Sequence, residues 1–432
     1  MKNQPIRFLA VRMLAGRKDP RGEKDLARRA LVGAIASVAI SIIPLITVMQ
    51  VADGMIGGIT SRYVELGTYH AQLHSYGARN LESTRNALRC LPEVRGAWIE
   101  TQTVGVVFAN GRREGVAVRG VEPDFILDES TTTYLRLETG VLALERPNDA
   151  LVGSAIASKL ELKQGDILNL ITVRRNQDGE PLPRVTILRV AGIVSAGYRE
   201  LDSQWVFMRN DTARKLFPAQ NSRSFVGIKL TAASGGQDAP TTLPGYAIPP
   251  GQVLYSWKTL ERNLFESLSS TRTMLLLIMA VTVIVAAINV SSALMTLVLE
   301  RHQEIAVLKG LGAEPGDLAV IFSMGGAALG AVGALFGAMG GLLASTRVNE
   351  LLHLIELVVN SIHFRVKPGQ DSAGEYFRIL DPEYYLEAIP VDVAFGEIAA
   401  VVGLTIAVSF LAALLPARKA ASLSPLELFR RH

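Results

Sequence analysis

Four stretches of this sequence contain no Asp, Glu, Lys or Arg, and their lengths limit the possible folds more than any other feature. They cover residues 30–52, 273–299, 318–346 and 398–417, which are 23, 27, 29 and 20 residues long. Each can cross a hydrocarbon core of about 30 Å as a helix that rises about 1.5 Å per residue. The sequence therefore predicts four transmembrane helices, which excludes a soluble enzyme and a disordered chain.

The 220 residues between the first two stretches, 53–272, have the composition of a water-exposed domain. Charged residues make up only 19% of the whole chain, and they concentrate outside the four apolar stretches. An Asn110-Gly111 turn predicts a β-hairpin here. The predicted fold is therefore a four-helix membrane protein with a large extracytoplasmic α+β domain between the first and second spans. Its predicted strands cover residues 103–109, 112–119, 166–173 and 185–194, and its predicted helices cover residues 150–162 and 254–271.

The charges flanking the spans predict the orientation of the chain in the membrane. Residues 1–29 hold nine Lys or Arg against three acids, and residues 418–432 hold four against one. Residues 347–397 hold four basic residues against nine acids. Because basic flanks stay in the cytoplasm, we expect a basic amphipathic N-terminus over 1–29 and a cytoplasmic tail over 418–432. The domain over 53–272 and the loop over 347–397 then lie on the other side.

The sequence contains no recognisable catalytic motif, so we expect the chain not to be an enzyme. No phosphate-binding loop, nucleophile elbow or metalloprotease motif occurs, so any ATP and Mg must be bound by a partner. His70 and His74 are spaced as on one face of a helix, yet nothing completes a metal site, and we expect two exposed histidines and no metal. The formal charge of +4 follows from the membrane flanks and does not imply nucleic acid.

Polar and small residues inside the spans predict how the helices pack. Asn289 is the strongly polar residue in mid-span, and we expect it to form a hydrogen bond between helices rather than to contact a ligand. Pro44 should kink the first span. The third span contains small-xxx-small pairs such as Gly333 and Gly337, which predict close helix packing within the subunit.

Two segments outside the spans have the features of partner-binding sites. Residues 300–309 predict a short amphipathic helix with Ile305 and Leu308 on one face, suited to a groove of a cytoplasmic partner. The connector over 174–184 contains Pro181-Leu182-Pro183. It predicts either a protruding loop that docks a soluble partner or the tip of a long hairpin.

Several motifs resemble those of one transporter family. ERHQEIAVLKGLGAEPGDL at 300–318 is similar to the coupling-helix region of ABC-transporter permeases of the FtsX/MacB superfamily, as is LAALLPARKAASLSPLELFR at 411–430. The segments VAVRGVEP at 116–123 and DALVGSAIASKLELKQGDILNL at 149–170 resemble its outer domain. EYYLEAIPVDV at 383–393 and VADGM at 51–55 resemble the lipoprotein-releasing branch, LolC and LolE. The resemblance does not distinguish LolC-type from LolE-type or a combined homodimeric role.

The resemblance implies a bacterial inner-membrane complex of two permease subunits and two cytoplasmic ATPase subunits. Its partners would be a LolD-like ATPase dimer, a second permease, a lipoprotein substrate, a periplasmic LolA-like carrier and membrane lipids. The site residues that we expect fall into three groups. The substrate cavity would be lined by Leu45, Val48, Met49, Ala52, Ile56, Phe265, Leu268, Met274, Leu275 and Ile278. Contact with the ATPase over 300–317 would use Arg301, Glu304, Ile305, Leu308 and Lys309. The carrier would dock on Pro181, Leu182 and Pro183.

Two other functions share this topology. A MacB-like exporter would move peptides or small amphiphiles, and only its substrate would differ. An FtsX-like transmitter would move no substrate and would use ATP-driven motion to activate a cell-wall hydrolase outside the membrane.

Overall fold

The computed structural model of the chain describes residues 26–422, except 76–79, 176–180, 218–219, 232–242, 244–247, 301, 311–313, 367–390 and 392. The chain divides into two compact units. We call them the helix unit (Met1–Gly54, Ser269–Leu357 and Pro390–His432) and the sheet unit (Met55–Leu268 and Val358–Ile389). The predicted N-terminal helix falls in residues 1–25 and the end of the tail in 423–432, and both lie outside the described residues.

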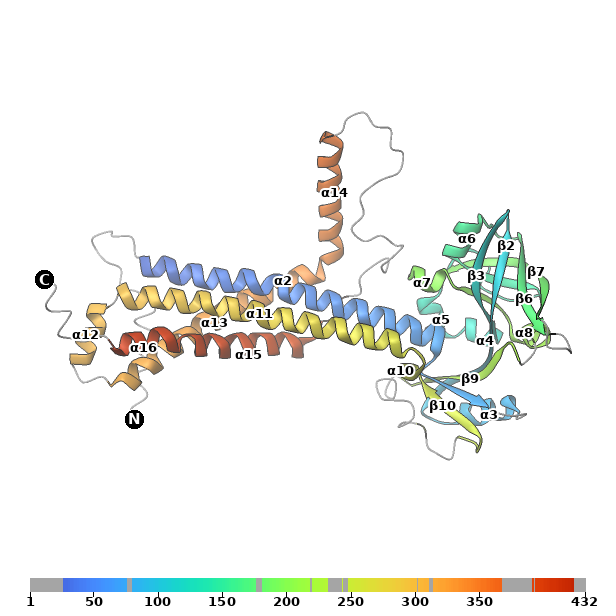
Figure 1. Cartoon of the computed structure of the whole chain (residues 1–432), viewed down its shortest axis with the longest axis horizontal. Coiled ribbons are helices and arrows are strands. Elements are labelled where there is room, and N and C mark those ends of the chain that lie inside the picture. Colours follow the sequence, from blue (N-terminus) through green and yellow to red (C-terminus); the bar gives the residue numbers. More distant parts are fainter. Residues whose placement is uncertain are drawn as a thin grey trace. The chain divides into compact units, whose positions relative to one another are not determined.

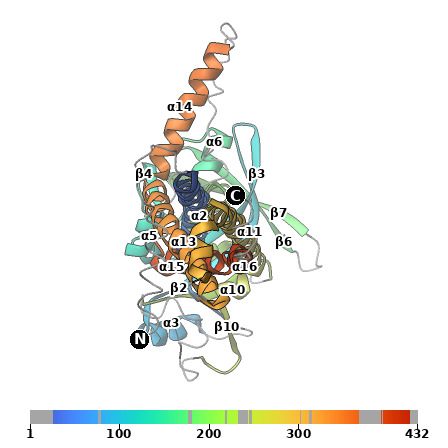
Figure 2. The same cartoon turned by 90° about the vertical axis from the view of Figure 1, so that its left-hand side faces the viewer.

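Long apolar helices build the helix unit (Figures 1 and 2). Within the described residues, four helical segments are long and apolar enough to cross a membrane: Arg29–Thr68, Arg262–Glu300, Gly316–Thr346 and Phe395–Ala420. Some of these helices run on into the sheet unit. The helices of this part of the chain are α2 (Leu26–Arg62), α11 (Arg262–Glu300), α12 (His302–Gly310), α13 (Pro315–Thr346), α14 (Val348–Val366), α15 (Phe395–Ala412) and α16 (Leu414–Ser422).

Glycines on α13 bring it close to two neighbouring helices. A methyl group on Gly333 or Gly337 would lie 2.7 Å from the Cβ of Val38 or Ile42 on α2. On the side of α15, a methyl group on Gly330 would lie 2.5 Å from Ser409 Oγ. Small residues permit this approach, which gives van der Waals contact where lipid supplies no hydrophobic drive. The predicted packing within the subunit is thus confirmed.

The predicted role of Asn289 is also confirmed, because its Nδ2 donates to Ser37 Oγ at 2.7 Å, from α11 to α2. Helix α2 continues through Pro44 without a break.

One prediction about the segment after the third span needs correction. The segment over 347–397, expected to be a loop, begins with the 19-residue helix α14. Its apolar residues recur at helical spacing, as in Leu351, Leu354, Ile355 and Val358, which is the pattern of an amphipathic helix.

The described strands of the sheet unit form one mixed sheet in the order β10-β1-β9-β2-β3-β8-β5-β7-β4, and β6 pairs with both β2 and β7. This extra strand closes a ring of six strands, β2-β3-β8-β5-β7-β6, around a buried apolar core. The strands are β1 (Ala71–Ser75), β2 (Val94–Ala109), β3 (Arg112–Val121), β4 (Arg136–Gly140), β5 (Asp149–Gly153), β6 (Ile167–Arg175), β7 (Pro181–Ser195), β8 (Trp205–Arg209), β9 (Arg223–Leu230) and β10 (Gln252–Ser256).

Short helices accompany the sheet. They are the π-helical turn η1 (Tyr63–Thr68), α3 (Leu81–Arg89), α4 (Pro123–Ile126), α5 (Glu129–Tyr134), α6 (Ser154–Leu160), α7 (Arg199–Asp202), α8 (Asn210–Leu216) and α10 (Trp257–Leu260). The Asn110-Gly111 hairpin is confirmed: both residues have positive φ, 51° and 76°, as a two-residue turn between twisted strands requires.

Two predicted helices were partly wrong, for a common reason. The helix expected over 150–162 begins as strand β5, and only Ser154–Leu160 is helical. The helix expected over 254–271 begins within strand β10. Both segments open with a short apolar run, and such a run gives no periodicity that separates a buried strand from a helix. Pairing with neighbouring strands decided both cases.

Candidate functional site

The helix unit has an apolar groove of about 230 Å³ between α2 and α11. Leu45, Val48, Met49 and Ala52 line it from one face of α2, at the i, i+3, i+4, i+7 spacing that keeps side chains on one side of a helix. Leu275, Leu276 and Met279 line it from α11. The complete lining is Ser41, Pro44, Leu45, Val48, Met49, Ala52, Asp53, Arg272, Leu275, Leu276, Ile278, Met279 and Thr282.

The groove brings together six of the ten residues predicted for the substrate cavity. These are Leu45, Val48, Met49, Ala52, Leu275 and Ile278. Met274 is largely exposed and is not part of the lining. Ile56, Phe265 and Leu268 belong to the sheet unit and are also not part of it.

Charged residues that were not predicted to line the groove close one end of it. Arg272 on α11 contacts two carboxylates: its Nε lies 3.2 Å from Asp53 Oδ1 on α2, and a guanidinium N–H donates to Glu397 Oε1 on α15. Close by, Gln50 Oε1 accepts a hydrogen bond from the backbone N–H of Ala394 at 3.1 Å. These contacts tie three helices together at one level.

The short helix α12 is present where a coupling helix was expected, but one of its predicted contacts needs correction. Ile305 is 0% exposed and belongs to the same apolar cluster as Leu318 and Ala420. It therefore anchors α12 to its own subunit instead of facing a partner. Val307, by contrast, is 57% exposed. Arg301 and the side chains of Glu304 and Leu308 lie outside the described residues, and Lys309 is half-buried.

The residues proposed for carrier docking lie in a strand rather than in a free loop. Pro181, Leu182 and Pro183 begin β7 and pair with β6, with Leu182 opposite Arg174. The connecting residues 176–180 lie outside the described residues. This part of the structure therefore corresponds to the alternative that the sequence left open, the end of a long hairpin.

One face of that hairpin carries exposed apolar side chains that were not among the predicted site residues. Val106 on β2, Ile171 on β6 and Val185 on β7 lie side by side in the register of the three strands, and all are exposed. We call the following exposed residues the apolar sheet face: Val104, Val106, Phe108, Ile167, Ile171, Val173, Val185 and Ile187. Contiguous exposed apolar surface of this kind marks an interaction site. The signal was present in the sequence, because these strands are apolar at successive positions and not only at alternate ones.

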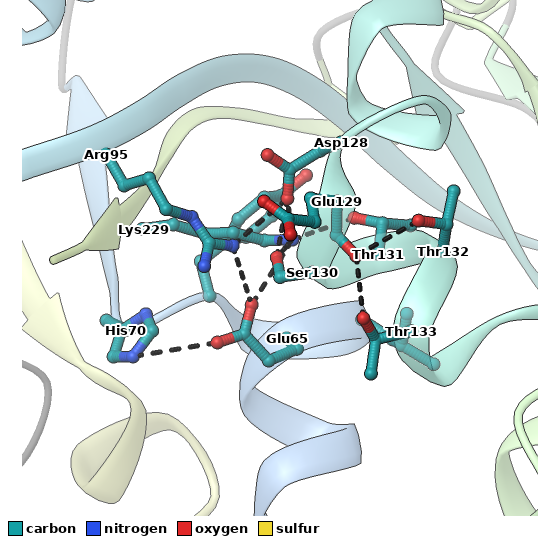
Figure 3. Close-up of polar contacts among 12 residues, drawn as sticks. Glu65, His70, Arg95, Asp128, Glu129, Ser130, Thr131, Thr132, Thr133 and Lys229 are labelled. Atoms are coloured by element: carbon teal, nitrogen blue, oxygen red, sulfur yellow. Dashed lines mark hydrogen bonds and ion pairs between the residues drawn. The ribbon is translucent and has the colours of Figure 1, made fainter. Parts of the chain in front are cut away.

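A buried polar network holds the π-helical turn η1 against the sheet (Figure 3). Lys229 on β9 is fully buried and lies 3.1 Å from Asp128 Oδ2 and 3.4 Å from Glu65 Oε2 of η1. Its Nζ also donates to Ser130 and Thr131. Burial lowers the pKa of Lys229, against the raising effect of Glu65 and Asp128. Every donor of this ammonium group is used inside the fold, so we regard the cluster as structural.

A second buried network fixes the end of η1 and the residue that follows it. Arg119 on β3 is paired with Glu100 at 2.6 Å and donates to the backbone carbonyls of Leu66 and Gly67. Tyr69 donates to the same Glu100 at 2.5 Å, and its burial raises its pKa well above the ordinary value. Both networks hold the segment that leaves α2 and enters the sheet.

The prediction of two exposed histidines at helical spacing also needs correction, because neither residue is on a helix. His74 lies in strand β1 and stacks on Phe225, while His70 precedes this strand and lies 3.9 Å from Glu65. Both are mostly buried rather than exposed, and burial lowers both pKa values. Among the described residues, no group of three His, Cys, Asp or Glu side chains could hold a metal ion.

Comparison with known proteins finds similar proteins over most of the chain. The family model described as FtsX-like permease C-terminal matches residues 276–425. The lipoprotein-releasing system transmembrane protein LolC of Xylella fastidiosa is 25% identical over 411 residues, covering 92% of this chain and 93% of that protein. LolC of Neisseria meningitidis serogroup B is 27% identical over 409 residues, covering 92% of each.

Among solved structures, the periplasmic region of MacB from Actinobacillus actinomycetemcomitans matches 46% of this chain and 93% of its own length. Its sequence identity to this chain is 12% and the TM-score is 0.29.

Proposed function

We propose that this chain, an FtsX-like permease related over almost its whole length to LolC, is a membrane subunit of an ABC transporter that extracts lipoproteins. The substrate would leave the outer leaflet of the bacterial inner membrane and pass to a periplasmic carrier. The observation that carries this proposal is the apolar groove between the first two membrane helices. A lipid-anchored substrate can enter such a groove sideways from the bilayer.

The groove matches the energetic problem that a lipoprotein poses. Each CH₂ of an acyl chain buried in the bilayer contributes about 0.8 kcal/mol, so several chains hold their protein firmly in the membrane. Leu45, Val48 and Met49 offer an apolar surface that replaces lipid at little cost. Methionine is flexible enough to adapt to chains of different shape. A second permease subunit would complete the cavity around the acyl chains.

The energy would come from ATP hydrolysed, with Mg, by a LolD-like ATPase dimer on the cytoplasmic side. Helix α12 is the expected point of contact, with the exposed Val307 toward the ATPase. Ile305, which is buried in the helix unit, would pass the motion of α12 to the membrane helices. Closure of the cavity would then expel the acyl chains.

The apolar sheet face would receive the released chains on their way to a LolA-like carrier. It lies on β2, β6 and β7. Strand β6 ends and strand β7 begins at the connector for which carrier docking was predicted. An apolar surface next to a carrier-binding hairpin would keep the acyl chains out of water during the transfer. Val106, Ile171 and Val185, at its centre, are the residues to test first.

The experiment that tests the proposal places a bulky side chain in the groove. We expect Val48→Trp to reduce ATP-driven release of a lipoprotein from reconstituted vesicles by about tenfold or more. It should also weaken photo-crosslinking of the lipoprotein to a probe at Leu45. Ile40→Trp is the matched control, because Ile40 is exposed on the same helix and outside the groove. Unchanged release and crosslinking in Val48→Trp would contradict the proposal.

The two other functions can be distinguished from this one by what the chain moves, if it moves anything. A MacB-like exporter would keep its transport of peptides or amphiphiles in vesicles without any lipoprotein. An FtsX-like transmitter would activate a hydrolase and would tolerate Val48→Trp, because its groove would carry nothing. The apolar lining of the groove favours a substrate with acyl chains over the FtsX-like transmitter, which would move no substrate.

A further inference from the structure

Helix α14 begins directly where the third membrane-crossing helix ends. The apolar segment Gly316–Thr346 is followed by Arg347, whose φ of −112° and ψ of 21° end α13, and α14 starts at Val348. The first part of α14, up to Leu357, belongs to the helix unit and turns away from α13 at this break (Figure 1). Because a span ends where hydrocarbon meets water, α14 starts at that boundary.

One face of α14 is apolar and exposed. Leu351, Leu354, Ile355 and Val358 follow the i, i+3, i+4, i+7 spacing that keeps side chains on one side of a helix. Their exposed fractions are 40%, 57%, 47% and 57%. Four large apolar side chains on one face, all open to the surroundings, are the pattern of a surface that something apolar covers. We call these four residues the α14 face.

The polar residues of α14 place it at a membrane surface and not across the membrane. Glu350 and Glu356 interrupt its apolar residues, and α14 is not among the four described helical segments that are apolar enough to cross. His353, whose side chain is 74% exposed, lies two residues from Ile355. Two residues differ by about 200° around a helix, so these side chains point to opposite sides. A helix divided in this way lies along an interface.

The apolar surface of α14 continues that of α13. Phe336, Met339 and Leu343 lie at i, i+3, i+7 spacing on α13 and are 56%, 57% and 62% exposed. In a membrane-crossing helix, such outward side chains are surrounded by hydrocarbon. The α14 face begins at Leu351, two turns further along the chain, so the same bilayer can cover it. This continuity identifies lipid, rather than a soluble protein, as the partner.

We propose that α14 is an interfacial helix, with the α14 face among the lipid acyl chains just below the headgroups. Its polar side, with Glu350 and His353, faces water. Up to Ser361, that side carries carboxylates and no Lys or Arg, so apolar contact and not attraction to anionic lipids holds it. The covalent link to α13 keeps α14 at the membrane, so weak contacts suffice. This role is independent of lipoprotein release and goes beyond the proposed function.

The test locates two neighbouring side chains relative to the bilayer. Cys90 is the only cysteine of the chain, so Cys90→Ser gives a background for single nitroxide labels. Labels at Ile355→Cys and at His353→Cys are compared in the full chain, in nanodiscs of uncharged phosphatidylcholine. Paramagnetic resonance measures collisions with oxygen, which concentrates in hydrocarbon, and with a water-soluble nickel chelate. We expect the oxygen-to-nickel ratio to be about fivefold or more higher at Ile355 than at His353, because only the first lies in lipid.

Two reference positions calibrate this ratio, and a second label secures it. Leu343→Cys on α13 reports hydrocarbon, and Lys163→Cys, at an exposed position of the sheet unit, reports water. Leu351→Cys repeats the measurement on the α14 face if Ile355→Cys does not fold. Equal nickel access at Ile355 and His353 would place α14 in water and overturn the proposal. Low access of both reagents at Ile355 would mean that protein covers this face, which also overturns it.

Discussion

Helix α13 approaches α2 and α15 through glycines, whereas the sheet unit fixes its incoming segment through buried ion pairs. In the first case, a methyl group on Gly337 would lie 2.7 Å from Ile42 Cβ. In the second, Arg119 and Glu100 are paired while 1% and 0% exposed. Both arrangements leave almost no free space, yet they use opposite residue types.

The difference follows from what surrounds each unit. Apolar helices in lipid gain no hydrophobic free energy when they associate, because the lipid is as apolar as their side chains. Their contacts depend on close approach and on a few hydrogen bonds such as that of Asn289. The sheet unit, with a composition suited to water, has a large apolar core that can offset the cost of burying a few charges, provided each charge is paired. Charge appears in the helix unit mainly at the ends of its spans, as in the contacts of Arg272 with Asp53 and Glu397.

The largest expected effect comes from breaking the buried ion pair. We expect Glu100→Ala to lower the free energy of unfolding of the sheet unit by about 3–5 kcal/mol, because Arg119 would stay buried without a carboxylate. The three tryptophans of the chain, Trp98, Trp205 and Trp257, all lie in the sheet unit. Their fluorescence during urea unfolding of the full chain in nanodiscs therefore reports this unit alone.

The matched control for this prediction is Glu114→Ala. Glu114 lies on the same strand as Arg119 and pairs at the surface with Lys159 at 3.3 Å. A surface pair of this kind contributes about 0–1 kcal/mol. Equal losses in the two variants would show that burial does not distinguish the pairs.

The second prediction concerns the apolar anchor of α12. Ile305→Asp would place a charge among Leu318 and Ala420, which is unfavourable without a partner. We expect insertion into the membrane to persist, ATP hydrolysis by the partner to continue, and lipoprotein release per ATP to fall about tenfold. Release and hydrolysis are measured together in reconstituted vesicles. Ile305→Val, which keeps an apolar side chain in this cluster, is the control for a change at this position. Release that stays coupled in Ile305→Asp would refute the anchoring role.

The third prediction tests the glycine contacts directly. Gly337→Ala should lower the stability of the helix unit by about 1–3 kcal/mol, since the added methyl group overlaps Ile42. Gly403→Ala meets no atom within 4 Å and should raise stability by up to about 1 kcal/mol, because alanine favours helix more than glycine. Loss of far-ultraviolet circular dichroism during titration with dodecyl sulfate measures both. Changes of the same sign would contradict the close-packing argument.

The smallest expected effect depends on pH. Asp202 in the sheet unit is buried, and burial raises its pKa to about 6, although Ser195 Oγ and the Ala196 N–H donate to it at 2.7 and 2.6 Å. An unfolded aspartate has a pKa of about 3.9. Between these values the folded state binds more protons, so stability falls as the pH rises. We expect a contribution of about 1 kcal/mol lost from pH 5 to pH 7, with one pKa unit worth about 1.36 kcal/mol.

Comparison with Asp202→Asn isolates this contribution from that of other titrating groups. The asparagine keeps an acceptor for the Ala196 N–H and does not titrate. Urea midpoints from tryptophan fluorescence should therefore depend less on pH in the variant by about this amount. An identical pH dependence in the two proteins would show that Asp202 titrates normally.

Much of the helix unit could be predicted from the sequence because lipid imposes a simple rule. A charge-free run long enough to span the bilayer must be a helix, since only helices and closed barrels satisfy their backbone there. The glycine spacing likewise indicated close packing, though not which helices would meet. In the sheet unit, the Asn110-Gly111 hairpin was predictable from turn chemistry. The short strands β5 and β10 were not, because pairing with distant strands decided them.

The candidate site shows the same division. Six groove residues could be predicted from their places on the first two spans, because they recur at helical spacing near the ends of these spans. The burial of Ile305 could not, since a stripe of apolar residues on a short helix fits its own subunit as well as a partner. The apolar sheet face also depended on the order of strands that are distant in the sequence.

The sequence by itself determined where the chain can cross a membrane, because the cost of placing charge in hydrocarbon is local to each segment. Only the tertiary structure decided that Asp53, Arg272 and Glu397, the charges that end three of those segments, meet at one end of the groove. The relative rotation of packed helices sets such meetings, and no single segment encodes it.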